Sequence, residues 1–191
     1  RNRHRLFGIM KKIYVLLTKT GTVPSKIIGK LSRARFSHAS LSIDNEFTDM
    51  FSFGRKGMKV FPGGFAKENL RTRVLKKYEN CPCEVISMEV TDENYEKIKN
   101  KALYFNDNKD IFGYSYIGIF ACWCRIKLKF KNRYFCSQCV SEILKAGNVQ
   151  LPYDPLLMRP MDFMKIKDIK KEYLGTIKDL AYLIDNKLIE L

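Results

Sequence analysis

The feature that most constrains the fold is the alternation in residues 36–54, FSHASLSIDNEFTDMFSFG, where small or polar residues interleave with apolar ones around Asp44, Asn45 and Glu46. A period of two is typical of a β-strand with one buried face, because successive side chains of a strand point to opposite sides. Two such runs on either side of a polar turn predict a β-hairpin.

The register of this hairpin decides which residues face His38. On the first strand His38, Ser40 and Ser42 share one face. With a turn at residues 44–46, opposite positions have numbers that add up to 90, which places Ser52 opposite His38. A two-residue turn would shift the pairing by one position.

The rest of the chain mixes helical and strand patterns and contains no internal repeat. We expect strands at 12–18 and 82–90, helices at 24–34, 91–105 and 136–147, a partly helical stretch at 111–130, and a final strand pair at 172–184. The order lacks the regular alternation of a doubly wound sheet, so it favours an α+β fold with an antiparallel sheet. A length of 191 residues predicts a single domain, 1–191.

Charge and hydrophobicity bound the partners and the location. The formal net charge of +15 favours acidic partners such as nucleic acid, anionic lipid or an anionic wall polymer, but the excess is spread along the chain, so no specific nucleic-acid site is predicted. The apolar run Ile13–Leu17 is too short for a signal peptide or a membrane span, so we expect a cytoplasmic protein without a transmembrane segment. No amphipathic membrane anchor is evident. Because the chain begins with Arg1, a start at Met10 and a start upstream both stay open.

Six cysteines form three close pairs, at positions 81 and 83, 122 and 124, and 136 and 139. A cytosolic chain with an adequate core neither needs nor keeps a disulfide framework. The last four cysteines could offer thiolates to zinc, yet the basic segment between them has no Gly- or Pro-bearing knuckle. No phosphate-binding or dinucleotide-binding motif is present, so neither a metal nor a cofactor is predicted.

Cys136 begins the helix predicted at 136–147, in YFCSQCVSEIL. The buried stripe of that helix runs through Cys136, Cys139, Val140 and Ile143, so Cys136 starts the face that packs inward. The first turn of a helix stabilises a thiolate through free N–H groups and the helix dipole. The residues alone leave two interpretations open, a nucleophile and a small buried side chain.

Two segments together resemble a known family. FSHASLSIDNEFTDMFSFGRKG and, 98 residues after His38, RYFCSQCVSEILKAGN are similar to the circularly permuted NlpC/P60 papain-like superfamily, the YiiX-like and lecithin:retinol-acyltransferase-like group. In that group the histidine strand precedes the cysteine helix, as it does here. The resemblance covers about residues 10–165, which leaves 166–191 as a C-terminal extension of unknown role.

The resemblance implies a cysteine nucleophile, a histidine that exchanges protons with it, and a polar residue on the next strand that orients the imidazole. Carried over, Cys136 is the nucleophile and His38 the base. The third position falls near Ser52, where many relatives carry a stronger acceptor.

Three further residues are predicted to bind the substrate. Tyr114 and Tyr116 lie ahead of the cysteine helix and would line the pocket, and Arg55 would hold a substrate carboxylate. Alternatively, the two tyrosines have no role in binding and pack in the aromatic core.

Three functions follow from this pattern. The leading hypothesis is a cysteine hydrolase, a papain-like peptidase or amidase, that cleaves an amide or related acyl bond of a small substrate through a thioester. The second is a lipid acyltransferase or thioesterase of the same fold. The third is a noncatalytic anion-binding module in which the cysteine only packs.

Overall fold

The computed structural model describes residues 10–19, 34–55 and 63–191. In these residues an eight-stranded sheet has the order β7-β6-β4-β3-β2-β1-β5-β8. Neighbouring strands are antiparallel except for the short parallel pair β6 and β7. The strands are β1 (Met10–Thr18), β2 (His38–Ser42), β3 (Met50–Arg55), β4 (Gly63–Glu68), β5 (Pro82–Thr91), β6 (Gly113–Tyr114), β7 (Arg133–Tyr134) and β8 (Lys170–Thr176). The predicted α+β class with an antiparallel sheet is confirmed at this level.

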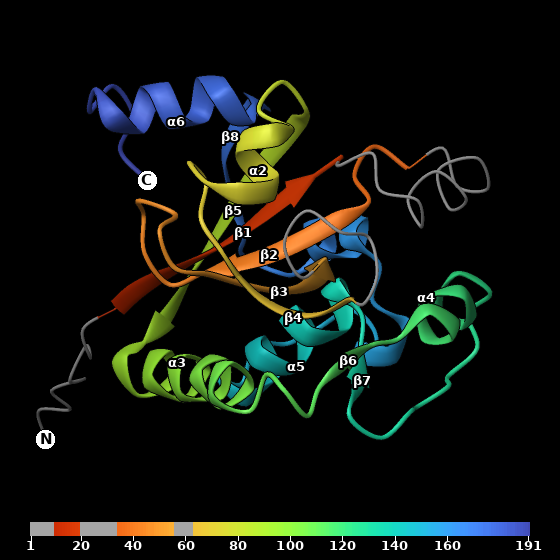
Figure 1. The fold of residues 1–191 in the computed structure, drawn as a ribbon. Coiled ribbons are helices and arrows are strands. Elements are labelled where there is room, and N and C mark those ends of the chain that lie inside the picture. The colour runs from red at the N-terminus through yellow and green to blue at the C-terminus, as the bar shows by residue number, and fades with distance from the viewer. Residues whose placement is uncertain (1–9, 20–33, 56–62) are drawn as a thin grey trace, which may run out of the picture.

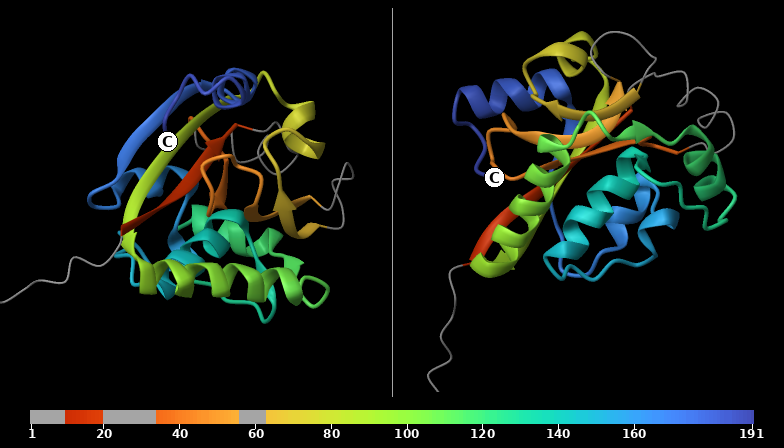
Figure 2. Two further views of the ribbon diagram at one scale, coloured as in Figure 1. Left: turned by 90° about the vertical axis from the view of Figure 1, so that its left-hand side faces the viewer. Right: turned by 60° about the horizontal axis from the view of Figure 1, so that its bottom comes forward.

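Helices cover both faces of the sheet (Figures 1 and 2). They are α2 (Arg73–Lys77), α3 (Asp92–Asp107), α4 (Tyr116–Trp123), α5 (Cys136–Ala146) and α6 (Ile177–Asp185), with 3₁₀ turns η1 (Pro155–Leu157) and η2 (Pro160–Lys165). β1 shows why two layers form: Val15 belongs to the core under α3 and α5, whereas Leu16 belongs to the core under α2 and α6. Because both faces of this central strand are buried, its sequence is a continuous run of apolar residues and does not alternate.

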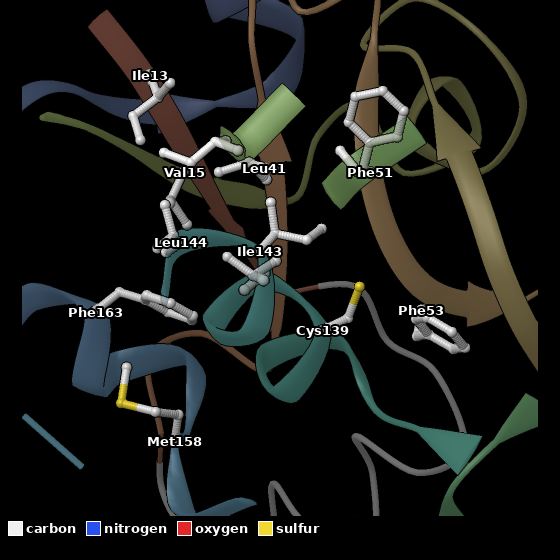
Figure 3. Packing of buried hydrophobic residues seen from close by; sticks show 14 of the residues in the cluster. Ile13, Val15, Leu41, Phe51, Phe53, Cys139, Ile143, Leu144, Met158 and Phe163 are labelled. Atoms are coloured by element: carbon white, nitrogen blue, oxygen red, sulfur yellow. The ribbon is translucent and has the colours of Figure 1, made fainter. Parts of the chain in front are cut away.

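The helix that carries Cys136 is anchored by its apolar stripe. Figure 3 shows Cys139 of α5 on the side of Phe53, and Ile143 toward Leu41. At the end of α5, a Cβ on Gly147 would come within 2.4 Å of the Ile98 side chain, so only glycine lets α3 approach this closely. The predicted helix at 136–147 is confirmed, and its fixed position determines where its first residue lies.

Most predicted elements are confirmed within one or two residues at their ends. The strands at 12–18 and 82–90 are β1 and β5, the stretch 111–130 contains α4, and the helix at 91–105 is α3. Thr91 caps α3 by accepting a hydrogen bond from the N–H of Asn94 at 3.3 Å. The helix predicted at 24–34 lies, apart from Ala34, outside the described residues.

The final strand pair predicted at 172–184 is wrong in its second half. β8 pairs with β5, but the chain then enters α6. Its Ile177, Leu180 and Ile184 are buried in the core under α2 and α6, which we call the second core. These residues follow helical spacing, and Thr176 caps the helix by accepting from the N–H of Asp179. The residues after 166 therefore complete the sheet and cover one of its faces.

The hairpin is present, but its predicted register is wrong. Leu41 pairs with Phe51 and Ser42 with Met50, so the position numbers add up to 92 rather than 90. The loop spans residues 43–49 because Phe47 turns back with a φ of 54° and is fully buried in the second core. In this register Ser52 lies across from Ser40, and the position across from His38 is Gly54.

The ladder between β2 and β3 consists of those two pairs in the described residues. The pairing stops before His38 on β2 and Gly54 on β3, although a Cβ on Gly54 would still lie 3.5 Å from His38 Cε1. α5 packs against both strands. The candidate site is built at this end of the ladder.

Within the described ranges, none of the helices has the length and the apolar character needed to cross a membrane.

Candidate active site

Cys136 is the first residue of α5, and only 1% of its surface is exposed. Its sulfur accepts hydrogen bonds from two backbone N–H groups, those of Ala39 on β2 and Ser137 on α5. The Ala39 bond ties the sulfur to β2 just beyond the point where the ladder with β3 stops. The N–H of Ala39 is therefore bonded to the Cys136 sulfur and is not part of the β2–β3 ladder described above.

Local sequence explains this position. Phe135 precedes the helix with extended backbone and no side-chain cap, so the first turn of α5 keeps N–H groups for other acceptors. The ring of Phe135 is fully buried against Ile119 and Cys122 of α4, which fixes the approach of the chain. The sequence thus presents the sulfur at the positive end of a helix dipole.

His38 begins β2, with 14% of its side chain exposed. Its Nε2 lies 3.2 Å from Oε1 and 3.5 Å from Oε2 of Glu68. Because Nε2 is taken by this carboxylate, Nδ1 is the nitrogen left to bond the Cys136 side chain. The predicted encounter of Cys136 and His38 is therefore present in the fold.

Glu68 ends β4 and completes the group. Ser40 Oγ donates a short hydrogen bond to Glu68 Oε2 and lies 3.2 Å from His38 Nε2. Burial alone would raise the pKa of Glu68, but the charge and hydrogen bond of His38, with help from Ser40, lower it. Glu68 is consequently an ionised carboxylate that holds the imidazole in place.

The electrostatics favour an ion pair between Cys136 and His38. Burial would lower the pKa of His38, but the Glu68 carboxylate and the hydrogen bond to Cys136 outweigh it and raise that pKa to about 10. Burial would raise the pKa of Cys136, but His38 and the two backbone N–H donors lower it below its ordinary value. The arrangement therefore favours a thiolate next to an imidazolium over the neutral pair.

Ser52 does not lie where the sequence placed it. In the observed register it is two positions from the residue opposite His38, and its fully buried hydroxyl donates to Ala39 O at 2.7 Å. This bond links β3 to β2 beyond the end of their ladder. The role of Ser52 is therefore structural. The contact with the imidazole that the sequence gave to Ser52 is made by Glu68.

Glu68 was missed because no strand was assigned to residues 63–68. A signal was present: Gly64, Ala66 and Glu68 share one face of a strand of period two, with Phe65 on the other. His38 and Ser40 lie on a similar face of small and polar residues. An isolated acid on such a face was the clue.

The predicted substrate-binding residues lie differently from one another. Tyr114 is near enough to Cys136 for the thiolate charge, after burial, to raise the pKa of its hydroxyl well above the ordinary value. Tyr116 packs against it, with ring centroids 4.7 Å apart. Arg55 ends β3, but its side chain lies outside the described part of the structure. A substrate-binding role for these three residues stays a prediction.

All six cysteines are free thiols. Among the described residues no three His, Cys, Asp or Glu side chains gather closely enough to hold a metal ion. Cys122, one of the four cysteines considered as zinc ligands, instead donates its thiol to Met158 O. Burial raises the pKa of this thiol to about 12.

Comparison of the chain with protein-family models and with curated proteins finds no match. Geometry and chemistry are therefore the basis for a functional assignment.

Proposed function

We propose that this protein is a cysteine hydrolase that cleaves an amide or related acyl bond through a thioester on Cys136. The observation that carries the proposal is the Cys136–His38–Glu68 arrangement, in which a helix-terminal sulfur has a lowered pKa and the histidine beside it a raised one. A buried cysteine that only packs has the opposite property, a raised pKa.

In the first step the Cys136 thiolate attacks the acyl carbon, and the electron pair of the carbonyl bond moves to oxygen. The imidazolium of His38 then gives its proton to the leaving group as the carbon–leaving group bond breaks, which leaves a thioester and a neutral imidazole. In the second step His38 takes a proton from water while the water oxygen attacks the thioester carbon. The carbon–sulfur bond then breaks with its electron pair going to sulfur, the carboxylic acid leaves, and the thiolate–imidazolium pair is restored.

Two groups would support these steps. Glu68, bonded to His38 Nε2, keeps Nδ1 directed at the sulfur and stabilises the charged imidazole. The backbone N–H of Cys136, in the first turn of α5, is suited to receive the negative oxygen of the tetrahedral intermediate. The hydroxyl of Tyr114 is a further donor within reach of the charge on Cys136.

The proposal extends to the fold and the setting. A histidine strand that precedes the cysteine helix in the chain, with that helix packed on an antiparallel sheet, supports a circularly permuted papain-like fold. Six free cysteines support a reducing compartment such as the cytoplasm as the place of action.

The test is alkylation of the protein by iodoacetamide as a function of pH, followed by intact-mass and peptide-mass measurement. We expect Cys136 to react near pH 6, well below the pKa of about 8.5 of an ordinary thiol. A Cys136 that reacts no faster there than an ordinary thiol would overturn the proposal and favour the noncatalytic module.

A second measurement tests acyl transfer itself. The protein is mixed with activated p-nitrophenyl esters and with dipeptide p-nitroanilides. The reaction is quenched in acid, and the intact mass of the protein is measured. We expect an acyl adduct on Cys136 that hydroxylamine removes, as a thioester requires. Reactive Cys136 without any adduct, across both reagent classes, would leave the protein with a reactive thiol but no acyl transfer, which contradicts the hydrolase.

A further inference from the structure

The outer side of α4 and the segment after it expose large apolar side chains. Ile117 and Phe120 are 64% and 59% exposed, and Ile126 is 58% exposed with Leu128 close behind it in the chain. The inner side of α4 is buried against Phe135. α4 stands at one side of the molecule, and the chain loops back from it to β7 (Figure 1). These four residues form what we call the α4 surface.

The α4 surface is bordered by cations. Residues 124–133 contain five basic residues and no acidic one, at positions 125, 127, 129, 131 and 133. Arg125 and Lys127 form ion pairs with Asp162 and Asp154. Lys129 and Lys131 are exposed and make no ion pair with other described residues. Positive charge is thus available beside exposed aliphatic side chains.

We propose that the α4 surface docks on an anionic lipid bilayer. Apolar side chains interleaved with lysines match the two layers of a bilayer interface, because Ile, Leu and Phe can enter the acyl region while lysines meet the phosphates. The sequence suggested no amphipathic anchor since the apolar residues come from two elements, a short helix and an extended segment. The fold holds the start of the segment against the end of α4, through a hydrogen bond from the N–H of Ile126 to Ala121 O at 2.9 Å.

Other occupants fit less well. Single-stranded nucleic acid is bound by aromatic platforms on which bases stack, whereas three of the four α4-surface residues are aliphatic. The cores of protein interfaces are depleted of lysine, which here lies directly between Ile126, Leu128 and Phe130.

Docking would orient the candidate active site. Phe135, which packs under α4, immediately precedes Cys136. A bilayer at the α4 surface would therefore lie on the side of the molecule at which α5 begins. Docking itself requires no catalysis, so it is tested independently of the proposed hydrolase.

The chain contains one tryptophan, Trp123, at the end of α4. It is half-buried, and the guanidinium of Arg159 stacks on it with a distance of 4.7 Å to the ring centroid. Its fluorescence is measured while vesicles of phosphatidylcholine, with or without phosphatidylserine, are added, and co-sedimentation gives the affinity. We expect a blue shift and binding with phosphatidylserine only, weakened by salt.

Three double variants separate the contributions. Ile117→Ser with Phe120→Ser removes apolar contacts, and Lys129→Gln with Lys131→Gln removes charge; each should weaken binding at least about tenfold. Lys77→Gln with Lys187→Gln is the matched control, since it removes the same charge from exposed positions at α2 and just after α6, on the other face of the sheet from α5. It should change binding less than about twofold. Circular dichroism verifies that each variant is folded.

Several results would overturn the proposal. They are an absence of vesicle binding by the full chain, and equal weakening by the control pair, which would mean generic charge attraction. A concentration-dependent dimer that is lost in the Ile117 and Phe120 variant would instead assign the surface to a second copy. Binding of oligonucleotide in preference to vesicles would assign it to nucleic acid.

Discussion

Cys136 and Cys139 lie three residues apart on the same helix, and both are almost completely buried, yet their thiols differ in chemistry. Burial raises the pKa of Cys139 well above its ordinary value, and the negative charge of Cys136 adds to this. The pKa of Cys136 is lowered, because His38 and two backbone N–H donors outweigh the same burial.

The difference shows that burial alone does not decide whether a cysteine is inert. Cys139 points into the aromatic core on the side of Phe53 (Figure 3), where burial and the charges of Cys136 and Glu142 outweigh the favourable charge of Lys101. Cys136 lies one turn earlier, beyond the end of the β2–β3 ladder, where an N–H of Ala39 and the imidazole of His38 are within reach. Partners, and not exposure, separate the two thiols.

The largest difference is expected when each of the two cysteines is replaced by alanine in turn. Cys136→Ala should abolish acyl-adduct formation and lower turnover of an activated ester by at least about a thousandfold, because the nucleophile is gone. Cys139→Ala should keep both and lose only about 1 kcal/mol of unfolding free energy through a small cavity. Intact mass and urea unfolding measure these effects. Loss of the adduct in Cys139→Ala alone would reverse the assignment.

His38→Ala should make Cys136 resemble Cys139. Without the imidazolium, burial is opposed only by the two N–H donors, so the pKa of Cys136 rises and its alkylation rate near pH 6.5 falls about 10- to 100-fold. The rate of iodoacetamide labelling against pH gives the result. His4→Ala, which changes the only other histidine of the chain, is the control and should leave the profile unchanged.

Glu68→Gln should lower the pH at which His38 loses its proton and the Cys136–His38 ion pair is lost. His38, with a pKa of about 10, loses its proton and its pairing as pH rises through that value. Removal of the carboxylate charge should lower this pKa by at least about one unit. Nitrogen-15 shifts of the imidazole across a pH titration measure it directly. Ser52→Ala, at the position that the sequence favoured, should leave the titration unaltered; a shift there would restore Ser52 as the orienting residue.

The smallest effect concerns acid stability. Glu68 has a lowered pKa, so its stabilising contribution is present above the ordinary value near 4.5 and is lost as pH falls through the folded value. We expect the unfolding free energy of the native chain to fall, on the order of 1 kcal/mol from this group, as pH drops from about 5 to 3. Glu68→Gln has already lost this contribution, so urea unfolding should show a flatter acid dependence. Equal slopes would mean that other carboxylates account for the acid loss.

The sequence by itself determined the local elements and two members of the candidate site. Periodicity is a local property, so the buried strands, α3 and α5 could be read from it, and the stripe of α5 placed Cys136 at the start of a buried face. The pairing of His38 with Cys136 as base and nucleophile was implied by the resemblance. Their proximity in the fold agrees with that expectation.

Tertiary structure alone decided the rest. Burial of Phe47 in the second core lengthened the loop and moved the register by two, which replaced Ser52 with Gly54 opposite His38. Only the pairing of β4 beside β3 brought Glu68 to the imidazole, 30 residues along the chain. Strand pairing and loop length depend on distant packing, which a local pattern does not encode.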